Sequence, residues 1–188
     1  MRKILLLAFL AYLFTNSANA QTIGNPVIDV ILSGYSVRTY STTPVTDEQL
    51  DLILKCGVKA PSAVNAQPWK FIVVKNADLQ KQVMATVSAG NVLIVVCGAE
   101  PKQPGSGPEF DCGLAVENMV IAAQGLGLGA RIYGSPVNTI NTARREALGI
   151  PEGYKAVTVL RIGNKDNTVD AVSAASTRKK PEEVIIYK

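Results

Sequence analysis

Ser62, Asn65 and Gln67 stand between two prolines in the segment APSAVNAQPW, which runs from Ala60 to Trp69. Proline restricts the backbone, and hydroxyl and amide groups both donate and accept hydrogen bonds. Such a segment can hold several polar groups against a neighbour with donors and acceptors of its own, such as a heteroaromatic ring. The residues alone give about equal weight to a loop that ends a helix and buries Trp69 in the core.

Ser36 and Arg38 are two residues apart in SVRTY, so both side chains point to the same side of an extended chain. Serine can donate a hydrogen bond to a phosphate, and arginine can donate two parallel ones. The pair is therefore a candidate phosphate site, although an exposed strand with a solvated arginine has the same pattern and is more common. The basic residues 178–180 are typical of solvated surface, but they would suit the same phosphate, which generally needs more than one cation.

The run GLGLG, from Gly125 to Gly129, ends a helical pattern and leads into a strand. A dinucleotide-binding fingerprint needs the opposite order, so the run predicts a helix end and not a nucleotide site. Gly134 and Ser135 follow soon after. Glycine would let a planar ligand approach the main chain there, although a simple turn has the same sequence.

The composition excludes several kinds of catalytic site. The 188 residues contain no histidine, which rules out Ser-His-Asp and Cys-His triads and histidine-ligated zinc. Catalysis is left to carboxylates, lysine, tyrosine, cysteine or a bound cofactor. Hydrophobic residues make up 47% of the chain and charged residues 18%, which predicts a packed core. The net charge of +4 includes Arg2 and Lys3, and no basic stripe is present, so nucleic acid is not an expected partner.

The first twenty residues have the pattern of a signal peptide. A basic start precedes an apolar run from Ile4 to Phe14 and the small-residue pattern that ends at Ala20. We expect cleavage before Gln21, export to the periplasm or the exterior, and one mature domain over residues 21–188 with no membrane attachment. A membrane anchor is the weaker alternative, because the apolar run is shorter than the roughly 20 residues that span a bilayer.

Cys56, Cys97 and Cys112 match no metal or redox motif. Cys56 and Cys97 lie in apolar patterns, so we expect both to be buried. A disulfide between Cys97 and Cys112 is the less favoured alternative to free thiols.

Helical and strand periods alternate along the mature chain, which predicts a domain of mixed α and β structure. In the second helix, Leu50, Ile53, Leu54 and Val58 share one face and are expected to be buried. We expect helices over 26–34, 46–58, 108–125 and 141–148, and strands over 70–75, 92–98, 130–134 and 155–163.

Four motifs resemble those of the nitroreductase family of flavin enzymes. SVRTY is similar to the family's S-V-R-x-[FY] opening, and APSAVNAQPWKFIVV is similar to its A-P-S-x-x-N-x-Q-P-W-x-F strand entry. DCGLAVENMVIAAQGLGLGA resembles D-x-x-x-A-x-x-N-x-x-x-A-A-x-x-x-G-L-G, and RKKPEEVI resembles the closing R-K-P-x-E-E-V. The resemblance runs from Ser36 to the tail, and PSxxNxQPW is its most specific part.

The resemblance implies an α+β fold, in which a central, mostly antiparallel sheet is flanked by helices. It also implies an intertwined homodimer with two FMN molecules at its interface. The long helix around Glu117 and Asn118 would pack the dimer, with a structural role for Asn118.

By position in the motifs, each cofactor-binding residue has an implied place along the flavin. Ser36 and Arg38 would hold the phosphate and ribityl end, with help from Arg178 or Lys179. Pro61, Ser62, Asn65 and Gln67 belong to the loop that would line the isoalloxazine ring from the opposite subunit, and Gly134 and Ser135 would face flavin N5.

The implied reaction is a ping-pong hydride transfer through the flavin. NAD(P)H delivers a hydride to N5 and leaves, and a nitroaromatic, quinone or similar acceptor then takes its place. No side chain is expected to be catalytic and no metal is expected, because the flavin carries the chemistry. Gly34 and Tyr35 stand where the family commonly has basic residues. Two alternatives stay open: a non-enzymatic, extracytoplasmic flavin-binding protein with the same fold, and a dimer that binds no flavin.

Overall fold

The computed structural model describes residues 24–100, 107–168 and 177–188. The chain divides into two units, Met1–Ser33 and Gly34–Lys188. The described part of the first unit is essentially helix α2 (Pro26–Ser33). Asn25 directly precedes this helix, and its side chain accepts a hydrogen bond from the Val27 amide at 3.0 Å. The predicted signal peptide and its cleavage site lie outside the described residues.

The second unit is built on a four-stranded antiparallel sheet with the strand order β1-β2-β4-β3. Its strands are β1 (Trp69–Val74), β2 (Val92–Ala99), β3 (Gly129–Tyr133) and β4 (Tyr154–Gly163). Every residue of β2 from Val92 to Gly98 is buried, as expected for an inner strand that is covered on both faces. In this order β1 and β3 are the two edges of the sheet.

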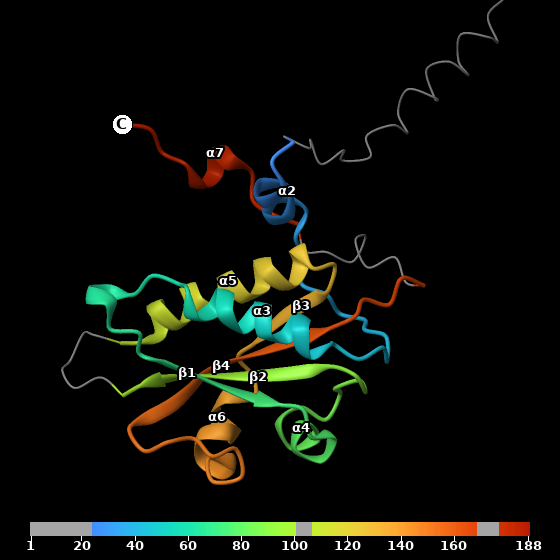
Figure 1. Ribbon diagram of the computed structural model, residues 1–188. Helices are drawn as coiled ribbons and strands as arrows, with labels where there is room; N and C mark the ends of the chain where they lie inside the picture. The colour runs from blue at the N-terminus through green and yellow to red at the C-terminus, as the bar shows by residue number, and fades with distance from the viewer. Residues whose placement is uncertain (1–23, 101–106, 169–176) are drawn as a thin grey trace, which may run out of the picture. The chain divides into compact units, whose positions relative to one another are not determined.

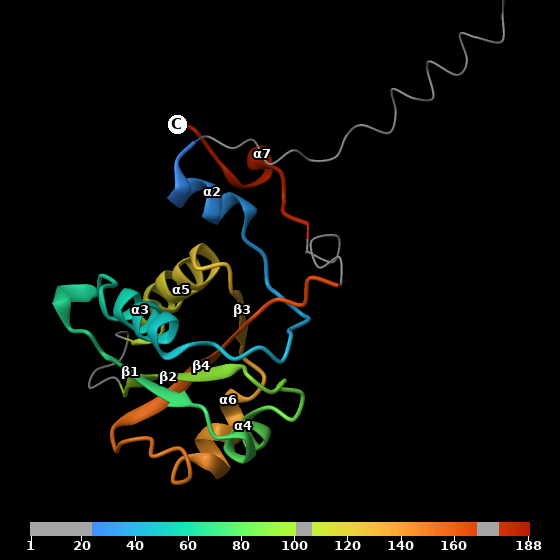
Figure 2. The ribbon, with the colours of Figure 1, turned by 45° about the vertical axis from the view of Figure 1, so that its right-hand side comes forward.

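Helices cover both faces of the sheet (Figures 1 and 2). α3 (Asp47–Val58) and α5 (Glu109–Gly125) lie on one face, and α4 (Ala77–Val83), α6 (Val137–Thr139) and the π-helical turn η2 (Ile140–Arg144) lie on the other. Ile94 of β2 joins Met119 in the first core, whereas Leu93 joins Ile140 in the second. The two cores arise because successive side chains of a strand point to opposite faces.

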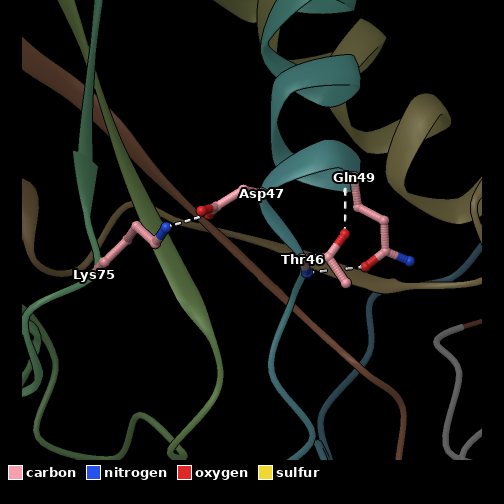
Figure 3. Close-up of polar contacts among 4 residues, drawn as sticks. All are labelled: Thr46, Asp47, Gln49 and Lys75. Carbon is pink, nitrogen blue, oxygen red and sulfur yellow. Dashed lines mark hydrogen bonds and ion pairs between the residues drawn. The ribbon is translucent and has the colours of Figure 1, made fainter.

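Helix α3 begins at the capping box that the sequence predicts (Figure 3). The Thr46 hydroxyl accepts a hydrogen bond from the Gln49 amide at 3.2 Å, and the Gln49 side chain accepts one from the Thr46 amide at 3.1 Å. Lys75, which follows β1, forms an ion pair with Asp47 in the first turn of α3 (Figure 3). These contacts fix the start of α3 beside the end of β1.

Three details of the predicted elements are wrong. Val58 is 54% exposed, and Gly57 is buried instead, because a Cβ there would lie 2.8 Å from Cγ of Met119 where α3 meets α5. Cys56 is exposed rather than buried. The helix predicted over 141–148 starts earlier, at Val137, and its π-helical part ends at Arg144.

The remaining predictions agree with the structure to within two residues at most boundaries. α5 ends at Gly125, and Gly127 has a left-handed backbone with a φ of 80°, so the glycine-rich run does end a helix. No helix in the described ranges has the length and apolar character needed to cross a membrane.

Candidate functional site

The loop that precedes β1 buries its tryptophan and exposes polar residues. Trp69 is buried and stacks on Phe71, with ring centroids 6.4 Å apart. Pro61, Asn65 and Gln67 are exposed just before it. The tryptophan therefore anchors the loop in the core, and the polar residues project from this anchor.

The backbone of this loop is strained. Val64, Asn65 and Gln67 have φ values of 47°, 57° and 47°, in the left-handed region that favours glycine. Such a conformation costs each of these residues about 1–2 kcal/mol. Val64 is the most unfavourable case because it is β-branched, and it is also 98% exposed, so packing within the chain does not repay its cost.

Hydrogen bonds hold the strained residues in place. The Ser62 hydroxyl accepts a hydrogen bond from the Gln67 amide at 3.0 Å, and the Gln67 side chain donates to the Asn65 carbonyl at 3.3 Å. The Ala63 amide donates to both carboxylate oxygens of Asp111, at 3.2 and 3.3 Å. Asp111 was not predicted as a site residue, since it lies 48 positions along the chain from Ala63. Its only sequence signal is its place at the head of the DCGLAVEN motif.

A pocket of about 470 Å³ opens between this loop and the start of α5. Val64 and Ala66 line it from the loop, Phe110 and Asp111 line it from α5, and Glu100 follows β2. Phe110 is 75% exposed, so the pocket offers an apolar surface with carboxylates at its border. A flat apolar molecule that carries a polar group fits this lining.

An ion pair joins the first residue of α5 to strand β4. Lys155 lies 3.0 Å from Glu109, and both side chains are partly exposed. The hydrogen bond from Lys155 lowers the pKa of the Glu109 carboxyl. Among the described residues, Glu109 pairs with Lys155 and not with the loop, which distinguishes it from Asp111 in the same helical turn.

Ser36 and Arg38 lie at the opposite edge of the sheet from this loop, beside the edge strand β3. Both are exposed, whereas Val37 between them is 1% exposed, which is the alternation expected of an extended segment. The Val37 amide donates to the Ala130 carbonyl at 3.2 Å. Gly129 leaves room for Val37, because a Cβ on Gly129 would lie 2.9 Å from the Val37 side chain. This fit fixes the segment that presents Ser36 and Arg38.

Gly134 and Ser135 follow β3 directly, and both are exposed. In the described part of the chain, no atom lies within 4 Å of the position that a Cβ on Gly134 would take, and its φ is not in the left-handed region. The chain itself therefore does not require glycine at this position. A ligand that lies close to the main chain would require it.

The structure brings some of the predicted site residues together and separates others. The segment 36–38 adjoins β3, which leads to Gly134 and Ser135. The loop 61–67 leads into β1, at the opposite edge of the sheet, and the two edges are about 14 Å apart across three strand spacings. Arg178 and Lys179 are exposed residues before α7 (Pro181–Val184). Within one chain, the predicted site is thus two half-sites: the loop half-site (residues 61–67) and the edge half-site (residues 36, 38, 134 and 135).

The buried thiols offer no ready nucleophile. Cys97 and Cys112 are free and fully buried, and the Cys112 thiol points to the Cys97 carbonyl at 3.9 Å. Burial raises the pKa of Cys97 to about 11 and that of Cys112 to about 12. Thiolates are therefore scarce at these two residues near neutral pH.

Sequence and structure comparisons identify the family. The profile of the nitroreductase family matches residues 31–94. A relative from Archaeoglobus fulgidus, named as a candidate NADH dehydrogenase/NAD(P)H nitroreductase, is 36% identical over 157 residues, which cover 78% of this chain and 90% of the relative. The chain belongs to the nitroreductase family.

Solved nitroreductases share the fold. A Bacteroides fragilis nitroreductase with bound FMN superposes with a TM-score of 0.73 at 25% identity, over 87% of this chain and all of that one. A nitroreductase candidate from Desulfovibrio desulfuricans, in complex with FMN, has a TM-score of 0.73 at 28% identity, over 87% of this chain and 97% of that one. The predicted α+β fold is therefore confirmed.

The nitroreductase profile covers parts of both half-sites, since residues 31–94 include Ser36, Arg38 and the whole loop. The role of each predicted cofactor residue stays a prediction. Asn118, expected to be structural, donates a hydrogen bond to the Cys56 carbonyl at 3.2 Å and so ties α5 to α3.

Proposed function

We propose that this nitroreductase-family protein is an FMN-dependent oxidoreductase that transfers reducing equivalents from NAD(P)H to a nitroaromatic, quinone or similar acceptor in a ping-pong reaction. The observation that carries the proposal is the pair of exposed half-sites on opposite edges of one sheet. Their chemistry suits the two ends of a flavin, and solved relatives of the same fold are described as FMN complexes.

The edge half-site suits the phosphate and ribityl end of FMN. Ser36 supplies a hydroxyl donor and Arg38 a permanent cation, and the fit of Val37 against Gly129 holds both outward. Arg178 or Lys179 would add a second cation. The open space beside the Gly134 backbone fits a flat ring that approaches the main chain closely.

The loop half-site suits the edge of the isoalloxazine ring, through Pro61, Ser62, Asn65 and Gln67. Because the sheet separates the two half-sites within one chain, the loop would act on the cofactor of a second copy. The proposed active form is therefore a homodimer with two equivalent sites, each built from the edge half-site of one subunit and the loop half-site of the other.

The exposed side of α5 supports this pairing. Gly113 lies there, and no atom of the residues that the structure describes lies within 4 Å of its Cβ position, although glycine inside a helix costs about 1 kcal/mol relative to alanine. Glu117 is exposed one turn further along. A glycine that its own chain does not need is explained by close approach of another helix, which a symmetric dimer supplies.

When bound, FMN supplies the redox chemistry, which suits a chain that has no histidine. The pocket beside Val64 and Phe110 would bind the nicotinamide and the acceptor in turn, and its apolar lining favours planar acceptors. We also propose that the mature protein starts at Gln21 and acts outside the cytoplasm.

The first test is cofactor uptake followed by turnover. We expect purified protein to absorb near 450 nm after incubation with FMN, and to oxidise NADH or NADPH when a nitroaromatic or quinone is present. Protein that binds FMN without turnover would favour the non-enzymatic flavin-binding alternative. Protein that takes up no FMN would overturn the proposal.

The second test asks whether the half-sites combine between subunits. Arg38→Ala damages the edge half-site, and Asn65→Ala damages the loop half-site. If sites form between chains, unfolding and refolding the two variants together would restore about one quarter of all sites, because each mixed dimer has one undamaged site. If sites form within a chain, mixing would restore none.

A further inference from the structure

We infer that Asp111 is a positioning residue, which holds the cofactor-facing loop 62–67 in its strained shape through the Ala63 amide. The inference rests on the proposed function for the identity of the ligand, FMN. The role acts through the loop, because the observed contact of Asp111 is with the Ala63 amide.

The hydrogen bond from the Ala63 amide ends on a buried carboxylate. Both carboxylate oxygens of Asp111 accept the Ala63 amide, at 3.2 and 3.3 Å, and Asp111 is only 7% exposed. A charged acceptor strengthens this hydrogen bond. Asp111 also lies in the first turn of α5, where the helix dipole favours a carboxylate. The loop is therefore tied to a rigid 17-residue helix and not to another loop.

The tie acts where the backbone needs support. Ala63 directly precedes Val64, the first of the three left-handed residues. At the other end of the loop, the Ser62 hydroxyl accepts from the Gln67 amide, the last of the three. The backbone hydrogen bonds of the short 3₁₀ turn Ala63–Asn65 lie between these two contacts. Burial adds little support, since neither Val64 nor Gln67 is buried, so loss of the Asp111 contact would weaken the hold on the strained backbone.

A purely structural role would make a different prediction. If Asp111 served only as a first-turn acid of α5, Glu109 in the same turn would be its equal. Glu109 pairs with Lys155 and does not touch the loop. Glu109→Gln is therefore the matched control for Asp111→Asn, because both replace one first-turn carboxylate by an amide of the same shape.

The experiment combines amide hydrogen exchange with FMN binding on the full-length mature chain. In cofactor-free protein, we expect the Ala63 amide to exchange about 10-fold faster in Asp111→Asn and up to about 100-fold faster in Asp111→Ala. We expect the Kd for FMN to rise about 10-fold in Asp111→Asn. Glu109→Gln should leave the exchange rate and the Kd at the wild-type values.

A rescue experiment separates positioning from general stability. Glycine adopts the φ of Val64 without steric cost. Val64→Gly therefore removes part of the strain that would otherwise pull the loop out of the shape that Asp111 holds. We expect the double variant Asp111→Asn/Val64→Gly to bind FMN more tightly than Asp111→Asn alone. Loss of stability without such a rescue would overturn the inference.

The outcomes distinguish this inference from the proposed function. Wild-type protein that binds FMN, with Asp111→Asn behaving as Glu109→Gln does in both measurements, would overturn the inference alone. Wild-type protein that binds no FMN would overturn the proposed function, and faster exchange confined to the Asp111 variants would then still support the hold of Asp111 on the loop.

Discussion

The two half-sites are held in place by different means. In the edge half-site, a buried valine and a backbone hydrogen bond to β3 fix an extended segment without strain. In the loop half-site, three residues adopt left-handed backbones, and backbone amides that donate to the Ser62 and Asp111 side chains hold them. The difference suggests which half is sensitive to which change: packing controls the edge half-site, and hydrogen bonding controls the loop half-site.

The largest effect is expected where the two half-sites must meet. Gly113→Glu would place a charged side chain on the exposed side of α5, so we expect dissociation into monomers and a rise in the Kd for FMN of about 100-fold or more. Light scattering and fluorescence titration with FMN measure the two quantities. Gly113→Ala is the graded comparison: its methyl group favours the helix within one subunit by about 1 kcal/mol but would crowd the partner helix, so it should weaken the dimer less than Gly113→Glu does. A Gly113→Glu dimer with unchanged FMN affinity would contradict the assignment of α5 to the interface.

The next effect isolates the phosphate end of the edge half-site. Arg38→Ala should weaken FMN binding by about 10- to 100-fold, as expected when a charged hydrogen-bond donor is lost. Riboflavin lacks the phosphate, so its affinity should fall much less. Equal losses for FMN and riboflavin in parallel titrations would mean that Arg38 acts on the ring and not on the phosphate.

A smaller effect on FMN binding is expected from alanine substitution of either of two glycines: Gly129, which begins β3, and Gly134, which directly follows it. Gly129→Ala would press a Cβ against Val37, which we expect to destabilise the fold by about 1–3 kcal/mol and to weaken FMN binding. Gly134→Ala meets no atom of the chain within 4 Å, so it should weaken FMN binding without lowering the free energy of unfolding. Urea denaturation and FMN titration of both variants test this contrast. Equal stability losses would show that Gly134 also serves the fold.

The smallest effect on binding is expected outside both half-sites. Thr46→Ala removes the cap of α3 and should lower the free energy of unfolding by about 1 kcal/mol. The FMN affinity should not change, because neither half-site depends on this cap. A parallel loss of FMN affinity would mean that general stability, and not local geometry, controls the site.

The sequence predicted the elements whose signals are local. The capping box at Thr46, the apolar run of β2 and the glycine stop after α5 each appear in a short stretch of residues, and each lies where predicted. Val58 was misplaced because helical periodicity cannot detect that Met119 needs the space beside Gly57.

The candidate site was less predictable from the sequence. The motifs named the residues of both half-sites, and their roles stay predictions. The left-handed backbone at Val64 has no local signal, since a β-branched residue disfavours it. Its cause includes a carboxylate 48 positions away along the chain. The exposure of Cys56 was missed for a related reason: a helical pattern does not specify which side of the helix its neighbours leave uncovered.

Helix α5 connects the two half-sites of one subunit. Its first turn contains Asp111, and its last residue leads through the glycine run into β3, beside Ser36 and Arg38. Seventeen helical residues make a rod about 26 Å long. A rod of this kind tilts or shifts as one body, so a displacement that starts at one end is transmitted to the other. In the proposed dimer, one FMN would lie near the first turn of α5 and the other near its last turn. The helix would then couple the two cofactor sites mechanically.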